Sequence, residues 1–300
     1  MSIEKYKIKK IRSSKKMGLV SMKSILSEAK INRYAAGAFT FCSLDTAYAI
    51  IDAANKANMP VILQAGPLEC DYAGLYELAE IAKFAAKRAN VPVALNLDHG
   101  DTIDRAKQAI DAGFTSVMID ASKCEYEENI RITKEVVKIA SPKNVSVEAE
   151  LGKIGGAEGL LDIQDIEATQ TDPDEAADFV SRTKIDALAV AVGTAHGFYK
   201  QAPVLNINRL KKIASKTDAL LVLHGGSGTP DLQVLEAINS GITKVNICTE
   251  FLAAMGKAFI ACQNADGFRF SYPALFEPAK IAGSKLAYDK IKFFANGFGK

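Results

Sequence analysis

The sequence contains no tryptophan, three histidines and five cysteines in 300 residues. The cysteines form no CxxC pair, and their odd number in a long chain favours reduced thiols over a disulfide framework, which indicates a cytoplasmic protein. No apolar run approaches the roughly 18 residues that cross a bilayer, so we expect no membrane anchorage. The formal net charge is only +2, which gives no general attraction for nucleic acid.

The first sixteen residues differ in composition from the rest. They hold seven lysines or arginines and one glutamate, without the apolar stretch and cleavage site of a secretory signal. Such a charge block is typical of a solvated tail. No Pro/Gly/Ser-rich linker divides the remaining chain. We therefore predict a basic tail over 1–16 and a single domain over 17–300.

Eight short, mostly continuous apolar runs alternate with helical patterns after this tail. Continuous apolar runs are typical of strands covered on both faces, as in parallel sheets. Eight βα units in succession predict an α/β fold of the TIM (β/α)8 barrel type. We also expect a helix near 22–29 at the bottom of the barrel and another over roughly 279–293 outside it. The predicted strands are 34–41, 60–65, 91–99, 116–120, 145–151, 187–193, 220–225 and 244–249.

All three histidines fall where predicted strands run into the following loops. His99 and His224 lie at the ends of the third and seventh runs, and His196 follows the sixth. Catalysis in TIM barrels takes place at these strand ends. Such positions make up roughly a tenth of a barrel sequence, so chance would place all three there in about one sequence in a thousand. Three neutral imidazoles that leave one coordination position open are typical of catalytic zinc, a Lewis acid.

Carboxylates accompany these histidines. Asp98 directly precedes His99, and its side chain is expected either to point away from the metal or to lie beside it on the rim. Glu148 and Glu150 share one face of the fifth strand, because side chains repeat every two residues. Buried glutamates need partners, which favours a place at or near the metal. Glu158 lies in the long glycine-rich connection after this strand, a length that is often functional.

The seventh and eighth strands carry a second pattern. Glycines surround Ser227 in the stretch 225–228 and allow backbone N–H groups to approach an anion closely. Thr249 begins a helix, whose N-terminus also attracts anions. Phosphate commonly binds beside these strands of a TIM barrel. The sequence therefore predicts a phosphorylated small molecule whose carbonyl is polarised by a metal.

Several long motifs resemble the class II, zinc-dependent fructose- or tagatose-bisphosphate aldolase family. The resemblance extends from Val20 to about Phe293 and is carried by VALNLDHG, VEAELGKIGGAE, VGTAHGFYK, LVLHGGSG and KVNICTE. It implies a lyase of carbohydrate metabolism that cleaves a phosphorylated ketose reversibly to dihydroxyacetone phosphate and an aldehyde. It also implies a homodimer or homotetramer.

The resemblance implies a role for each matching residue. His99, His196 and His224 would bind Zn²⁺, with Glu150 as an alternate ligand. Three further residues would be catalytic: Glu158 would move the proton at the nucleophilic carbon, Asn246 would stabilise the enediolate together with zinc, and Asp98 would exchange the proton of the aldehyde oxygen. The phosphate, with a monovalent cation nearby, would be held by Gly197, Gly225, Ser227, Cys248 (through its backbone) and Thr249.

Departures from the family pattern cluster where the aldehyde half would lie. Family residues are replaced by Thr40, Gly66, Asn96, Cys248 and the stretch Ser271-Tyr272-Pro273. The last of these replaces an Asp-Pro-Arg whose arginine binds phosphate, and proline offers no bidentate guanidinium. We predict a standard nucleophile and a non-standard aldehyde. Either the aldehyde lacks the usual terminal phosphate, or Arg269 or Lys280 binds it.

Three other hypotheses about the function fit the sequence less well. A Schiff-base aldolase needs a lysine inside the barrel on a late strand, and Lys244 lies near the wrong end of the eighth run. A non-catalytic barrel subunit that supports a partner enzyme would be expected to have lost ligands or the acid, and this chain keeps all of them. A metal-dependent hydrolase of this fold would carry an HxH pair after the first strand, which is absent.

Overall fold

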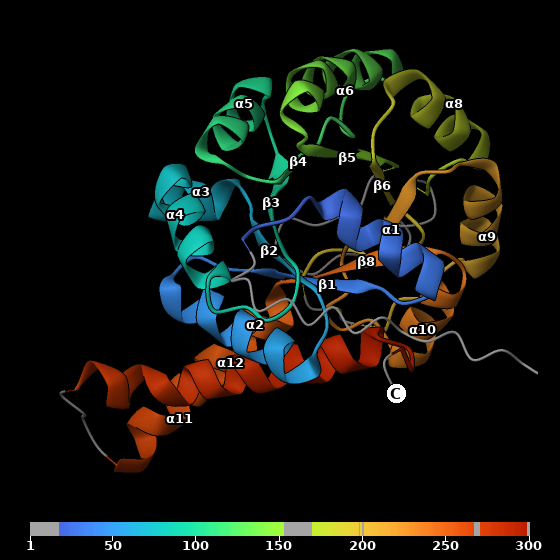
Figure 1. Ribbon diagram of the computed structural model, residues 1–300. Coiled ribbons are helices and arrows are strands. Elements are labelled where there is room, and N and C mark those ends of the chain that lie inside the picture. Colours follow the sequence, from blue (N-terminus) through green and yellow to red (C-terminus); the bar gives the residue numbers. More distant parts are fainter. Residues whose placement is uncertain (1–17, 153–169, 198, 200, 267–270, 299–300) are drawn as a thin grey trace, which may run out of the picture.

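The eight strands close into an all-parallel barrel in which each strand pairs with its sequence neighbours and β1 pairs with β8. This computed structural model describes residues 18–152, 170–197, 199, 201–266 and 271–298, with backbone only for 264–266. The predicted TIM barrel is confirmed (Figure 1). The strands are β1 Ala36–Thr40, β2 Val61–Ala65, β3 Val93–Gly100, β4 Ser116–Ile119, β5 Ser146–Leu151, β6 Ala187–Val190, β7 Leu220–Leu223 and β8 Ile242–Ile247.

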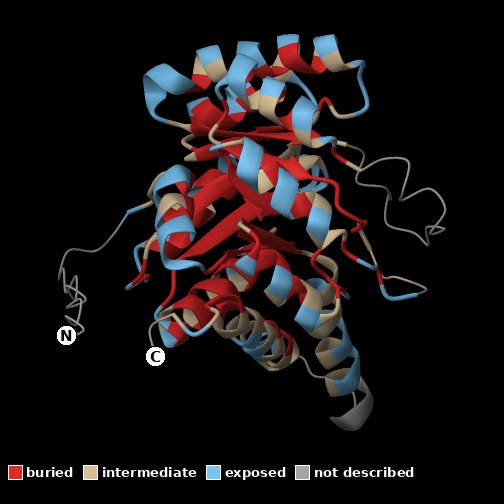
Figure 2. Cartoon of the chain, turned by 90° about the vertical axis from the view of Figure 1, so that its right-hand side faces the viewer, coloured by how far each residue is buried: buried red, intermediate tan, exposed pale blue. Residues whose placement is uncertain are grey.

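Helices surround the strands, with their exposed faces outward and their buried faces against the sheet (Figure 2). Among the described residues, none of these helices combines the length and apolarity needed to cross a bilayer. The helices are α1 Met22–Asn32, α2 Leu44–Ala57, α3 Pro67–Ala73, α4 Leu75–Ala86, α5 Ile103–Ala112, α6 Tyr126–Ala140, α8 Pro173–Thr183, α9 Ile207–Lys216, α10 Asp231–Asn239, α11 Thr249–Asp266 and α12 Tyr272–Phe294, with a short 3₁₀ turn at Ser141–Lys143.

Local signals in the sequence set several helix ends. Ser43 caps α2 by accepting a hydrogen bond from the backbone N–H of Thr46, as its position predicts. Gly113 ends α5 with a φ of +100°, a conformation that glycine adopts without a Cβ penalty. The connections between strands and helices are therefore fixed by local chemistry.

Helix α1 closes the N-terminal end of the barrel, as predicted. It lies across the barrel in Figure 1. Met22, Ile25 and Leu26 are buried against small and branched side chains that point inward from the strands. This apolar cluster fills the lower part of the barrel interior, and the polar strand ends lie above it.

Inward-facing residues change from apolar to polar along the strands. Ala38, Ile62 and Val222 belong to the lower apolar cluster. Two positions further along the same strands, the inward residues are Thr40, Gln64 and His224. The two-residue period of the strands thus brings polar side chains from many strands to one level at the C-terminal end.

Some element boundaries differ from the sequence prediction. Strand β8 begins at Ile242, two residues earlier than expected, and β7 ends one residue before His224. The C-terminal helix begins at Tyr272 rather than near 279 and runs through Pro278. Proline disfavours a helix interior, but α12 packs along both α2 and α11, and this tertiary contact outweighs the local preference. The pair α11–α12 extends beyond the barrel (Figure 1).

Candidate active site

A cavity of about 920 Å³ opens at the C-terminal ends of the strands. It gathers nearly every site residue predicted from the sequence. Glu158 lies outside the described residues. His224 is fully buried beside the cavity, and its Nδ1 contacts Nε2 of His99, which lines the cavity. The predicted residues that line the cavity are Asp98, His99, Glu150, His196, Gly197, Gly225, Ser227, Asn246, Cys248 and Thr249.

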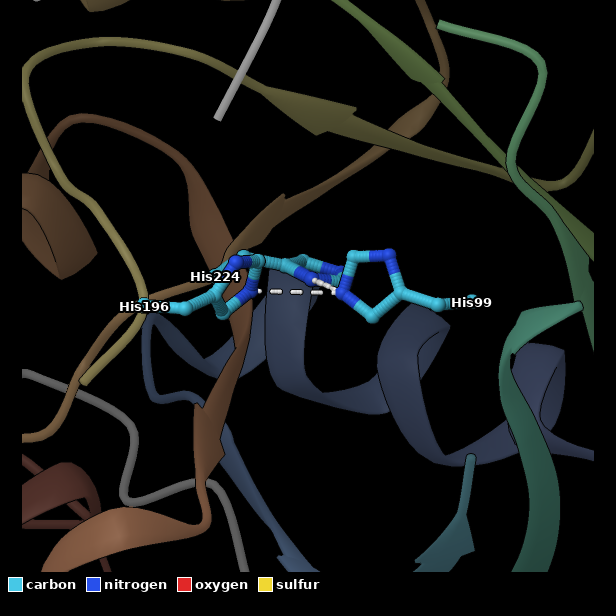
Figure 3. Close-up of side chains that lie close together, drawn as sticks. All are labelled: His99, His196 and His224. Atoms are coloured by element: carbon cyan, nitrogen blue, oxygen red, sulfur yellow. Dashed lines mark hydrogen bonds between the residues drawn. The ribbon is translucent and has the colours of Figure 1, made fainter. Parts of the chain in front are cut away.

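The three imidazoles point toward one another (Figure 3). Nε2 of His99 lies 3.2 Å from Nε2 of His196 and 2.9 Å from Nδ1 of His224. Nitrogen ligands about 2.05 Å from a tetrahedral zinc ion lie roughly 3.3 Å apart. The convergence therefore fits a metal site of three nitrogens, and the cavity leaves room for further ligands.

A backbone irregularity lets Asp98 and His99 serve the same cavity although they are neighbours in a strand. His99 has a φ of +47°, which is uncommon for a residue other than glycine. The register between β3 and β4 also shifts between Leu97 and Gly100. Of the two orientations that the sequence left open for Asp98, the structure has the one beside the histidines. The sequence carries no visible signal for this bulge.

Carboxylates hold two of the histidines in orientation. Oδ2 of Asp120 lies 2.9 Å from Nδ1 of His99, and Oε1 of Glu148 lies 2.8 Å from Nε2 of His224. Each contact occupies the ring nitrogen that faces away from the convergence point, so the other nitrogen is left to bind a metal. Our sequence reasoning missed Asp120, although it directly follows β4 and the rule of strand ends applies to it.

Lys244 lies inside the barrel, which corrects our reason for setting it aside. Its side chain is fully buried, and its Nζ lies 2.8 Å from Oε2 of Glu148. The ammonium group is therefore paired beneath His224 and serves as a counter-ion. Glu148, which we expected at or near the metal, occupies the position between the two.

The electrostatic environment shifts the pKa values of the three histidines in different directions. Burial opposes protonation of His99, but Asp98 and Asp120 outweigh it and raise its pKa to about 9. Burial and the neighbouring His99 lower the pKa of His196 to about 3. Burial also lowers the pKa of His224. The last two imidazoles are thus neutral and could act as ligands directly, whereas His99 would have to lose its proton to solvent before its nitrogen could coordinate a metal.

Asp98 is held by two amides. Its Oδ2 accepts a hydrogen bond from Nε2 of Gln64 at 2.9 Å, and its Oδ1 accepts one from Nδ2 of Asn246 at 3.1 Å. Both amides face inward from β2 and β8. Gln64 was missed in the sequence, although its place near the end of a buried strand is the same signal that identified Asn246.

A second group of potential ligands lies behind His99. Oε2 of Glu150 is 4.0 Å from Nδ1 of His99, and Asp120 belongs to the same group. Glu150 therefore lies beside the imidazoles, on the side of His99 that faces away from the three-nitrogen site.

The glycine turn after β7 is built for close backbone approach. Gly225 has a φ of +64°, and a Cβ there would lie 2.3 Å from the carbonyl oxygen of Ala195. The hydroxyl of Tyr199 accepts a hydrogen bond from the N–H of Ala195 at 2.8 Å and lies 2.9 Å from the carbonyl oxygen of Gly225. These contacts join the loops after β6 and β7. Ser227 and Thr249 complete this edge of the cavity.

Comparison with known proteins agrees with this architecture. Residues 20–297 match the family described as fructose-bisphosphate aldolase class-II. A 6-phospho-5-dehydro-2-deoxy-D-gluconate aldolase from Halalkalibacterium halodurans is 44% identical over 93% of this chain and 96% of its own length. A fructose-bisphosphate aldolase from Staphylococcus aureus is 41% identical over 93% of this chain and 98% of its own.

Solved structures give the same relationship. The YdjI aldolase from Escherichia coli K12 superposes with a TM-score of 0.82 at 33% sequence identity, covering 94% of this chain and 100% of that one. The extent of these matches, together with the grouped imidazoles and Asp98, establishes the chain as an aldolase, a lyase of carbohydrate metabolism and a member of the class II fructose-bisphosphate aldolase family.

Proposed function

We propose that this aldolase uses Zn²⁺ and cleaves a phosphorylated ketose reversibly to dihydroxyacetone phosphate and an aldehyde. The observation that carries the proposal is that one cavity is lined by His99, His196, the Asp98 carboxylate and the glycine turn after β7, with the nitrogen of buried His224 converging on that of His99. A metal beside an anion-binding turn suits a substrate with a carbonyl near a phosphate.

The residues fit zinc by the chemistry of their donor set. His99 and His196 present Nε2 and His224 presents Nδ1, and the nitrogen of His99 lies from each of the other two at a spacing close to that of tetrahedral ligands. Bound zinc supplies a Lewis acid that polarises the substrate carbonyl. Glu150 is the proposed alternate ligand. We also propose a monovalent cation near the phosphate, in keeping with the family resemblance.

This chain's own residues then move the protons. In cleavage, Asp98 takes the proton of the hydroxyl on the carbon that becomes the aldehyde, and the carbon–carbon bond breaks. The electron pair passes to the dihydroxyacetone-phosphate half as an enediolate, which the amide of Asn246 stabilises. Glu158 delivers a proton to the carbanionic carbon. The phosphate is held by Gly197, Gly225, Ser227, Thr249 and the backbone of Cys248.

The aldehyde half is proposed to be non-standard. Lys280, one candidate for binding a terminal phosphate, pairs with Glu277 at 3.2 Å and does not line the cavity of its own chain. Arg269, the other candidate, lies outside the described residues. A compound named 6-phospho-5-dehydro-2-deoxy-D-gluconate, cleaved between C3 and C4, yields dihydroxyacetone phosphate and 3-oxopropanoate. A carboxylate therefore replaces the second phosphate in such a substrate.

We further propose that the protein is a cytoplasmic homodimer or homotetramer that contacts neither nucleic acid nor membrane, with one barrel domain over 17–300 after the basic tail 1–16. The complete set of imidazoles and the Asp98 carboxylate weigh against a non-catalytic supporting subunit.

The test combines metal analysis with an aldehyde panel. We expect about one zinc ion per chain, loss of aldol cleavage with EDTA, and its return with zinc. Substrate trapped on the protein by borohydride would contradict this mechanism and identify a Schiff base. Strong preference for glyceraldehyde 3-phosphate over unphosphorylated aldehydes would contradict the non-standard aldehyde.

A further inference from the structure

Acidic side chains dominate the cavity, and one lysine interrupts them. Among the described residues that line it, Lys123 is the single lysine or arginine. The acidic residues there already have neighbours: Asp98, Asp120 and Glu150 surround the imidazoles, Oε2 of Glu69 accepts from the N–H of Gly66, and Asp101 pairs with Arg105. Lys123 has no ion-pair or hydrogen-bond partner within the part of the chain that the structure describes.

The backbone that carries Lys123 is fixed. Ser122 donates two hydrogen bonds to Oδ1 of Asp120, from its N–H at 3.1 Å and from its hydroxyl at 2.7 Å. The N–H of Cys124 then donates to the carbonyl oxygen of Ala121 at 3.0 Å and closes a turn around residue 123. Since Asp120 also holds His99, the lysine is joined to the metal site by a short, hydrogen-bonded segment.

Lys123 and the glycine turn lie on opposite sides of the barrel mouth. Lys123 follows β4, whereas Gly225 and Thr249 follow β7 and β8, and in a closed barrel of eight strands β4 lies across from β8. Asp98 and His99 come from β3 and His196 follows β6, between these two sides, whereas His224 directly precedes the glycine turn at the end of β7. A substrate that reaches both places therefore carries an anionic group at each end and its reacting carbons in the middle.

We propose that Lys123 is the specificity residue for the aldehyde half and binds a carboxylate at its far end. This inference rests on the proposed function, because it assigns the phosphate of dihydroxyacetone phosphate to the glycine turn. A single ammonium group is a point charge that matches one carboxylate. A dianionic phosphate in the same place would leave one negative charge unbalanced among acidic neighbours.

The test measures condensation of dihydroxyacetone phosphate with three aldehydes: 3-oxopropanoate, propanal, which has the same length without charge, and glyceraldehyde 3-phosphate. The variants are Lys123→Met, Lys123→Arg and, as a matched control, Lys134→Met on the exposed face of α6. Exchange of the C3 proton of dihydroxyacetone phosphate is measured in each protein, because this step needs no aldehyde.

We expect the wild-type protein to favour 3-oxopropanoate. Lys123→Met should raise KM for 3-oxopropanoate about 10- to 100-fold, the loss expected for one charge-assisted hydrogen bond. Its kcat, its KM for propanal and its proton exchange should stay within about twofold of wild type. Lys123→Arg should restore most of the affinity, and Lys134→Met should have no effect.

An unchanged KM for 3-oxopropanoate in Lys123→Met, or an equal rise for propanal, overturns the assignment of Lys123. A rise confined to glyceraldehyde 3-phosphate overturns the carboxylate. If these results occur while the wild-type protein exchanges the proton, the proposed aldolase function stands and only the role of Lys123 fails. Absence of exchange in the wild-type protein overturns both.

Discussion

Replacing Lys244 with methionine is expected to destabilise the protein far more than a surface lysine replacement would. The side chains of Lys244, Glu148 and His224 are all fully buried, and Glu148 bridges the other two at 2.8 Å on each side. Burial raises the pKa of Glu148, but Lys244 and His224 outweigh it and hold that pKa at about 2. Loss of Lys244 therefore leaves a carboxylate without its cationic partner in the barrel interior.

The magnitude follows from that burial. Removing one partner of a buried ion pair costs about 3–5 kcal/mol, because the remaining charge is uncompensated. Glu148→Gln alone leaves a buried ammonium and should cost a similar amount. The double variant Glu148→Gln with Lys244→Met removes both charges and should recover at least about 3 kcal/mol of the summed losses. The exposed pair Lys285–Asp289 on α12 is the control, with coupling of about 0.3–0.5 kcal/mol.

The assay is urea unfolding of the protein after EDTA treatment, which removes the contribution of bound metal to stability. Equal slopes with shifted midpoints would show that stability alone has changed. In the folded protein, Glu148→Gln should also weaken zinc binding by about 10- to 100-fold, because Glu148 orients His224. A cost below about 1 kcal/mol for Lys244→Met, or a double variant no more stable than the sum of both losses predicts, would show that Lys244 and Glu148 do not stabilise the barrel as a buried ion pair.

Three shorter predictions concern the cavity. Gly225→Ala should lower Tm by several degrees and raise KM for dihydroxyacetone phosphate, since its Cβ meets a backbone oxygen at 2.3 Å. Gly256→Ala, in open space on α11, is the control. Equal effects of the two changes would contradict the proposed role of the glycine turn in phosphate binding. Asp98→Asn should lower kcat for cleavage by about 10²- to 10⁴-fold while proton exchange continues; loss of both would reassign its role. Asp120→Asn should weaken zinc binding by about 10- to 100-fold, measured by chelator competition, and an unchanged affinity would count against its orienting role.

The barrel could be predicted from the sequence because the local conformational preferences of its residues agree with the packing of the folded barrel. Buried parallel strands read as short apolar runs, and Ser43 and Gly113 mark helix ends through local hydrogen bonding and backbone freedom. Boundaries were less accurate where tertiary packing competes with local preference. Pro278 argues against a helix by itself, yet α12 passes through it along α2 and α11.

The sequence also placed the three histidines and Asp98 at strand ends, and the closed barrel makes these ends converge. The residues alone thus specify the candidate ligands, the order of the strands and the motifs of the family.

The way in which neighbouring side chains share the cavity depends instead on the folded barrel. The left-handed conformation of His99 turns it toward His196 while Asp98 stays beside it. The pairing of Lys244 with Glu148, and the position of Lys123 across from the glycine turn, also depend on contacts between strands far apart in the chain. Spacing along one strand cannot report such contacts, because they arise only when the barrel closes and brings separate strands to the same level.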